Sequence, residues 1–120
     1  MRNVLAILIF ANGFNAAVET SDGFVERSFA NTDEGVELFL QWAEPLVLKV
    51  GAKVKFCTVS PDGDEGKIED WLLKNNTGPA SISPHAYREY AAKNSAPPES
   101  AITVAKACYA VFPFIKNTKP

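Results

Sequence analysis

The feature that most constrains this chain is a near-continuous apolar run near its beginning, over residues 4–10. An uninterrupted series of Val, Leu and Ile is typical of a strand that is buried on both faces of a sheet. The run is too short to cross a bilayer, which needs about 20 apolar residues. A short secretory segment after Arg2 is the alternative, but Asn12, Gly13 and Asn15 follow directly. We therefore expect a central β-strand here.

The composition is that of an ordinary soluble domain. The chain has 120 residues, of which 47% are hydrophobic and 22% are charged, and this fits one compact core. The formal net charge of -2 gives no general attraction to a nucleic-acid backbone or to an anionic membrane. We expect a single domain over residues 1–112, a frayed tail over residues 113–120, a cytoplasmic location and no membrane insertion.

The two cysteines, Cys57 and Cys108, lie in apolar surroundings. They form no CxxC or Cys/His spacing, which argues against a zinc site and against a disulfide framework. Buried free thiols are therefore expected at both positions.

The order of the remaining elements predicts a mixed sheet. Residues 14–19 and 24–29 flank an Asp-Gly turn, which indicates a β-hairpin next to the first strand. Further strands are expected over residues 54–59 and 79–83, and helices over residues 33–43, from residue 64, over 84–93 and over 99–111. Pro45 should end or kink the first of these helices.

This order predicts an α/β fold in which three antiparallel strands are extended by two parallel strands, giving a five-stranded mixed sheet flanked by helices. Ribonuclease-H-like domains have this plan, and a generic α/β sandwich is the competing interpretation.

One motif carries a resemblance to a known family. The residues F-A-N-T at 29–32, then Gly35, Leu38 or Phe39, and Trp42 resemble the F-x-N-T-x-x-G-x-x-x-L-x-x-W signature of DEDD-type insertion-sequence transposases of the Piv invertase group. Residues 83–91 and 100–105 are similar to two further segments of that family. The resemblance covers residues 4 to about 112 and implies the N-terminal, RuvC-like domain. We expect no counterpart of the family's second, serine-bearing half.

The resemblance also shows where this chain departs from the family. The positions that correspond to the four metal-binding carboxylates are Leu8, Thr58, Pro97 and Ser100. Two-metal phosphodiester chemistry needs several carboxylates that converge on a pair of cations. The resemblance therefore implies a degenerate pseudoenzyme that is not an active enzyme and has no metal and no cofactor.

Two alternatives keep a direct role with nucleic acid. A divergent metal-dependent nuclease would use Asp62, Asp64 and Glu65, although these acids also suit a polar turn before a helix. A nucleic-acid-binding or partner-binding surface would use a set of residues from the helix at 84–93, which mixes aromatic and basic side chains that stack on bases and pair with phosphates. This set consists of His85, Tyr87, Arg88 and Lys93. Packing of Tyr87 on the core is the other interpretation of its spacing.

The segment over residues 105–115 is strongly apolar, with Tyr109, Phe112 and Phe114 in a short span, and any part of it that is exposed would form a patch for a protein partner or for a homodimer. The preferred function is a non-catalytic protein-binding domain derived from a mobile-element, transposase-like scaffold. An inhibitor or regulator of plasmid conjugation, or of another mobile-element process, is an example of such a domain.

Overall fold

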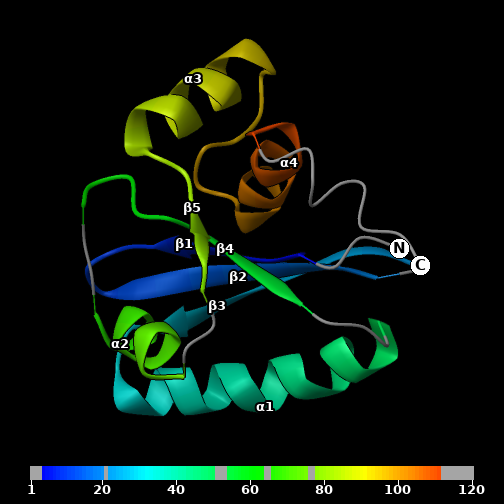
Figure 1. Ribbon diagram of the computed structural model, residues 1–120, viewed down its shortest axis with the longest axis vertical. Helices are drawn as coiled ribbons and strands as arrows, with labels where there is room; N and C mark the ends of the chain where they lie inside the picture. The colour runs from blue at the N-terminus through cyan, green and yellow to red at the C-terminus, as the bar shows by residue number, and fades with distance from the viewer. Residues whose placement is uncertain (1–3, 21, 51–53, 64–65, 76–77, 112–120) are drawn as a thin grey trace.

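A five-stranded mixed sheet forms the middle of the molecule (Figure 1). The computed structural model describes residues 4–20, 22–50, 54–63, 66–75 and 78–111. The strands are β1 (Val4–Ile9), β2 (Gly13–Thr20), β3 (Gly23–Ala30), β4 (Lys55–Val59) and β5 (Ala80–Ser81), in the order β3-β2-β1-β4-β5. Strand β2 is antiparallel to both β1 and β3, whereas β4 is parallel to β1 and β5 is parallel to β4. The predicted α/β class and the mixed five-stranded sheet are confirmed.

Strand β1 is the centre of both cores. All six of its residues are buried, because β2 and β4 flank it and helices cover both of its faces. Successive side chains of a strand point to opposite faces, so Leu8 belongs to one hydrophobic cluster and Ile7 to the other. The apolar run that suggested a central strand therefore contributes to two packed layers.

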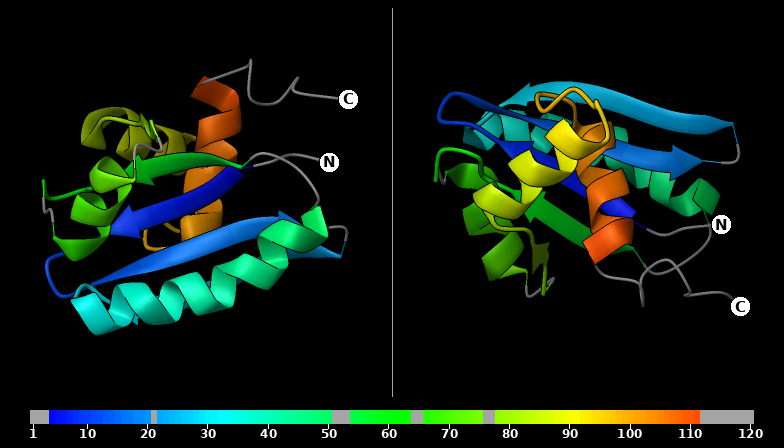
Figure 2. Two further views of the ribbon diagram at one scale, coloured as in Figure 1. Left: turned by 60° about the horizontal axis from the view of Figure 1, so that its bottom comes forward. Right: turned by 90° about the horizontal axis from the view of Figure 1, so that it is seen from above.

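The helices divide evenly between the two faces of the sheet (Figures 1 and 2). Helices α1 (Asp33–Val50) and α2 (Lys67–Lys74) pack on one face. Helices α3 (Pro84–Lys93) and α4 (Ala101–Val111) pack on the other. No helix within the described ranges is long and apolar enough to cross a membrane.

The prediction that Pro45 ends or kinks the first helix near residue 43 is wrong in its boundary, because α1 continues through Pro45 to Val50. A proline inside a helix leaves the carbonyl four residues earlier, here that of Gln41, without its usual donor. Both residues are exposed. Water can therefore take the place of the missing backbone N–H, and the helix is able to continue.

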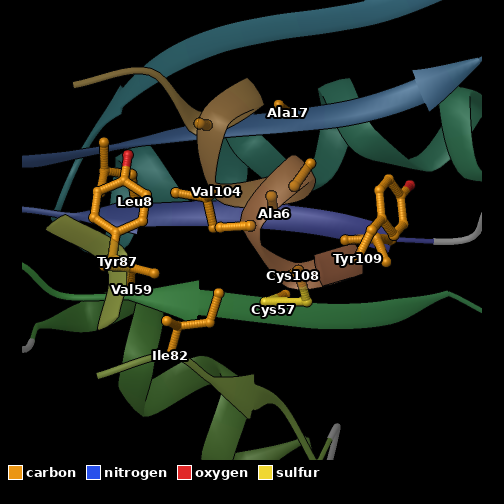
Figure 3. Packing of buried hydrophobic residues seen from close by; sticks show 14 residues of the cluster. Ala6, Leu8, Ala17, Cys57, Val59, Ile82, Tyr87, Val104, Cys108 and Tyr109 are labelled. Carbon is orange, nitrogen blue, oxygen red and sulfur yellow. A yellow bond between two sulfur atoms is a disulfide. The ribbon is translucent and has the colours of Figure 1, made fainter. Parts of the chain in front are cut away.

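The prediction of two free thiols is also wrong, because Cys57 on β4 and Cys108 on α4 form a disulfide (Figure 3). Both cysteines are completely buried. They are 51 residues apart and carry no local pairing signal. Only the packing of α4 against the β1–β4 face brings the two sulfur atoms together.

The remaining differences lie at the ends of elements. Strand β5 has only two residues, and α4 begins at Ala101 rather than at residue 99. Helix α2 begins at Lys67, and residues 64 and 65 lie outside the described part of the chain. The tail predicted over residues 113–120 also lies outside it.

Candidate functional site at the carboxyl end of the central strand

Leu8 lies near the carboxyl end of β1, and apolar side chains surround it. The β1–β4 register places Val59 beside it, and both residues are 1% exposed or less. Tyr87 from α3 and Val104 from α4 belong to the same cluster, and Figure 3 shows both next to Leu8. This end of the strand is therefore filled by packed side chains.

Thr58 does not share this environment. The register pairs Thr58 with Ile7, so its side chain points to the opposite face of the sheet from that of Leu8. Its hydroxyl shares a hydrogen bond of 3.1 Å with the hydroxyl of Ser81 on β5. The structure therefore brings Val59, and not Thr58, next to Leu8.

The connection between α3 and α4 covers the same end of the sheet. The hydroxyl of Tyr87 donates a hydrogen bond of 2.6 Å to the carbonyl of Pro98. The side-chain amide of Asn15 on β2 donates to the carbonyl of Glu99 at 3.0 Å, and its oxygen accepts a hydrogen bond from Ser28 on β3 at 2.7 Å. Tyr87 of the preceding helix and Asn15 of the distant strand β2, itself held by Ser28, therefore fix the connection in place.

The other two positions taken from the family lie in this connection. Pro97 is exposed. The hydroxyl of Ser100 donates to a carboxylate oxygen of Glu26 at 2.9 Å, and the backbone N–H of Ala101 donates to the other oxygen at 2.7 Å. Ser100 and Glu26 together cap the start of α4. These two polar side chains therefore have a structural role.

The electrostatics of Tyr87 agree with this arrangement. Burial raises the pKa of its hydroxyl well above its ordinary value, and the negative charges of Glu99 and Glu26 raise it further. The hydroxyl therefore stays protonated and acts as a hydrogen-bond donor to the connection. The tyrosinate form, which could act as a general base, is therefore not readily formed at this position.

The four residues predicted as a binding surface on α3 do not share one surface. Tyr87 has no exposed area, so its ring cannot stack on a base or on a partner. His85 and Lys93 are exposed, and the imidazole of His85 lies 3.8 Å from the carboxylate of Glu89 one turn later. A lone surface histidine with an acidic neighbour is an ordinary solvent-facing pair.

Arg88, the fourth residue, holds the loop that follows β4. Its guanidinium donates to the carbonyl of Pro61 and lies 3.4 Å from the carboxylate of Asp62. Asp62 is one of the three acids of the nuclease alternative, and the other two, Asp64 and Glu65, lie outside the described residues. Within the described ranges, no group of three or more His, Cys, Asp or Glu side chains could hold a metal ion.

The apolar segment near the end of the chain is described only in part. Tyr109 is buried, and its hydroxyl donates to the carboxylate of Glu19 at 3.1 Å. Tyr109 is therefore not part of an exposed patch. Phe112 and Phe114 lie outside the described residues.

The aromatic residues of the motif over residues 29–42 pack on the face of the sheet that α1 covers. The ring centroid of Phe29 lies 5.5 Å from that of Phe14, 5.6 Å from that of Phe39 and 5.5 Å from that of Trp42. Phe39 is buried whereas Leu38 is 53% exposed, so Phe39, and not Leu38, packs in this aromatic cluster.

The polar residues of the motif form the junction between β3 and α1. Asn31 donates from its amide to the carbonyl of Phe10 and accepts from the backbone N–H of Ile68, both at 3.1 Å. Thr32 accepts from the N–H of Gly35 at 3.0 Å and caps α1. A Cβ atom on Gly35 would lie 1.7 Å from the carbonyl oxygen of Ala30, so only glycine fits there. These contacts give the motif a structural role.

A shallow cleft of about 350 Å³ lies between α1 and α2. Its walls combine apolar and charged side chains, and Lys67 lies 3.9 Å from Asp33 across it. The lining residues are Asp33, Val36, Glu37, Leu40, Lys67, Asp70, Trp71 and Lys74. The cleft is on the opposite face of the sheet from Leu8 and does not extend the strand-end site.

The fold and the strand-end site define an α/β protein with a mixed five-stranded sheet, in which the carboxyl end of the central strand is closed by packing. Neither models of known protein families nor curated protein sequences match the chain.

Proposed function

We propose that this chain is a non-catalytic protein-binding domain built on a ribonuclease-H-like scaffold of the transposase type. The strand order, with three antiparallel strands followed by two parallel ones, supports this scaffold. The resemblance of residues 29–42 to the transposase signature is the basis for the proposed link to mobile elements. Regulation or inhibition of conjugation, or of another mobile-element process, is the role that we propose for the domain.

The single observation that carries the non-catalytic part is the position of Leu8. Metal-dependent cleavage needs carboxylates that converge on the cations, and Leu8 is fully buried beside Val59 and Tyr87. A carboxylate at this place would lose its hydration without a compensating partner. The packing supports a scaffold that has lost the reaction and kept its shape.

The burial of Tyr87 and the contacts of Arg88, both on α3, favour protein binding over nucleic-acid binding. Tyr87 is buried and Arg88 is engaged by the loop after β4, so these two side chains do not form a pair that stacks on a base and binds a phosphate, although His85 and Lys93 remain exposed. The net charge of -2 adds no general attraction to phosphates.

A cytoplasmic location belongs to the same proposal. The disulfide between Cys57 and Cys108 argues against it, because disulfides are rare in reducing compartments, and the bond is therefore the feature to measure. Trapping the thiols with a maleimide reagent in intact cells, before lysis, measures the fraction of chains in which the bond is formed. A fully oxidised population would contradict a cytoplasmic location.

Two measurements test the function. The purified chain is incubated with Mg²⁺ or Mn²⁺ and with single-stranded, double-stranded and branched DNA, and we expect no cleavage and no salt-sensitive binding. The immobilised chain is then exposed to a nuclease-treated extract of its host cells, and we expect a specific protein to be retained. Metal-dependent cleavage, salt-sensitive binding of the purified DNA, or an extract from which no specific protein is retained would each overturn the proposal.

A further inference from the structure

Strand β3 forms a long and regular edge of the sheet. It pairs with β2 over eight successive residue pairs without a bulge, and among the described residues no strand lies on its other side (Figure 2). The opposite edge strand, β5, has only two residues. A long edge strand presents unpaired backbone groups and is a template for a further strand.

The backbone groups that face outward can be assigned from two contacts. The N–H of Asn31 donates to the carbonyl of Asn12 at 3.3 Å, and the carbonyl of Phe29 faces Gly13. Odd-numbered residues of β3 therefore direct their backbone groups towards β2. Since these directions alternate along an antiparallel strand, the groups of Phe24, Glu26 and Ser28 point away from the sheet.

The usual protections of an edge are missing from β3. Its sequence contains neither proline nor lysine, which commonly block edge pairing. The carboxylate of Glu26 is engaged by Ser100 and Ala101 at the start of α4. The guanidinium of Arg27 lies over the ring of Phe29, 5.6 Å from its centroid. The two charges at the middle of the strand are thus directed to this chain's own groups.

We infer that β3 pairs with β3 of a second copy of this chain, antiparallel, about a two-fold axis that passes through Val25. A two-fold axis normal to the sheet keeps each face continuous, so each residue meets a residue of equal parity. An axis at Glu26 or Arg27 would place like charges directly opposite each other, which is destabilising. An axis at Val25 pairs Val25 with its own copy, Phe24 with Glu26, and Arg27 with Gly23.

The apolar side chains at this place support the Val25 register. Phe24 and Val25 are only partly buried, and Val25 belongs to neither core cluster. A second strand across the edge would cover both side chains, and pairs of β-branched residues stabilise antiparallel strands. The result is a ten-stranded sheet that continues through the two copies. This inference is independent of the proposed lack of catalysis.

Sedimentation equilibrium of the whole chain, at concentrations up to about 0.5 mM, tests the inference. We expect the wild type to dimerise. Val25→Glu and Val25→Lys each place like charges on the two-fold axis, and each should weaken the dimer by about tenfold or more. An equimolar mixture of the two variants should regain wild-type affinity as a mixed dimer, because opposite charges then meet at the axis.

Leu73→Glu and Leu73→Lys are the matched controls, because Leu73 is 66% exposed on α2, which packs on β4, on the other side of β1 from this edge. These two variants should dimerise like the wild type. Circular dichroism checks that all four variants are folded. A monomeric wild type, a dimer that the Val25 variants leave intact, or two weakened variants that do not reassemble on mixing would each overturn the inference.

Discussion

Glu26 on β3 accepts a hydrogen bond of 2.7 Å from the backbone N–H of Ala101, the first residue of α4, across 75 residues of sequence. The first N–H groups of a helix have no partner within the helix. A carboxylate at this end also complements the helix dipole. This one contact fastens the last helix to the edge strand and fixes the connection that closes the end of β1.

Replacement of this carboxylate should weaken the fold measurably. Glu26→Gln removes the charge at the helix start and one acceptor of the cap, so the free energy of unfolding should fall by about 0.5–2 kcal/mol. Urea unfolding followed by circular dichroism measures the change. Glu44→Gln on the exposed side of α1 is the matched control and should change the free energy by less than about 0.5 kcal/mol. Equal effects of the two variants would contradict the role of Glu26.

The disulfide should make a large contribution to stability. It closes a chain segment with a sequence separation of 51 residues, for which the loss of unfolded-state entropy corresponds to about 4 kcal/mol. The double variant Cys57→Ala/Cys108→Ala should lower the free energy of unfolding by about 2–5 kcal/mol. A reductant should destabilise the wild type and leave the double variant unchanged. Two thiols that react with a thiol reagent in the unfolded, unreduced protein would contradict the bond.

Leucine should be far more important at position 8 than at position 38. Leu8→Ala leaves a cavity beside Val59 and Tyr87, so the free energy of unfolding should fall by about 2–5 kcal/mol. Leu38→Ala, the same change at a 53% exposed position, should cost less than about 0.5 kcal/mol. Chemical denaturation of the two variants compares these values. A small effect at Leu8 would mean that the strand end is not closed by packing.

The raised pKa of Tyr87 predicts a loss of stability at alkaline pH. The folded state holds the hydroxyl proton more tightly than the unfolded state, so this contribution is complete below about pH 10 and is lost as pH rises above it. Tyr87→Phe removes the hydrogen bond to Pro98 and should cost about 1 kcal/mol at neutral pH.

Above about pH 10 the free energy of unfolding of the wild type should fall towards that of Tyr87→Phe. The difference between the two should shrink by at most about 1.4 kcal/mol for each pH unit. Urea unfolding in a series of buffers from about pH 8 to about pH 11 measures this difference. Leu38→Ala removes no titratable group and should differ from wild type by a constant amount. If the difference between wild type and Tyr87→Phe were also constant with pH, the pKa of Tyr87 would not be raised in the folded state.

Local patterns were sufficient to predict most of the secondary structure. The Asp-Gly turn predicted the β2–β3 hairpin, and the structure closes it with Thr20 opposite Gly23. Thr32 before Asp33 and Glu34 predicted the start of α1, and the Thr32 hydroxyl caps it. In each case the residues that determine the structure are neighbours in sequence, so their physical preferences can be read directly.

The residues that close the strand end gave no such signal. Nothing near Glu26 or Asn15 indicates that they hold residues 99–101, because these contacts span 75 and 84 residues. The spacing of Tyr87 suited both a core ring and a binding surface, and the packing of α3 against the cluster of Leu8 decided for the core.

The sequence by itself determined the buried central strand, the order of the elements and the lack of an acid at position 8, because apolar periodicity, turn chemistry and residue identity are local properties. Only the tertiary structure decided that Cys57 meets Cys108, that Val59 rather than Thr58 lies beside Leu8, and that α1 continues past Pro45. These outcomes depend on which faces of distant elements are packed together and on which backbone groups remain open to water. The strand register and the position of α4 fix those faces, and no short segment of the chain contains that information.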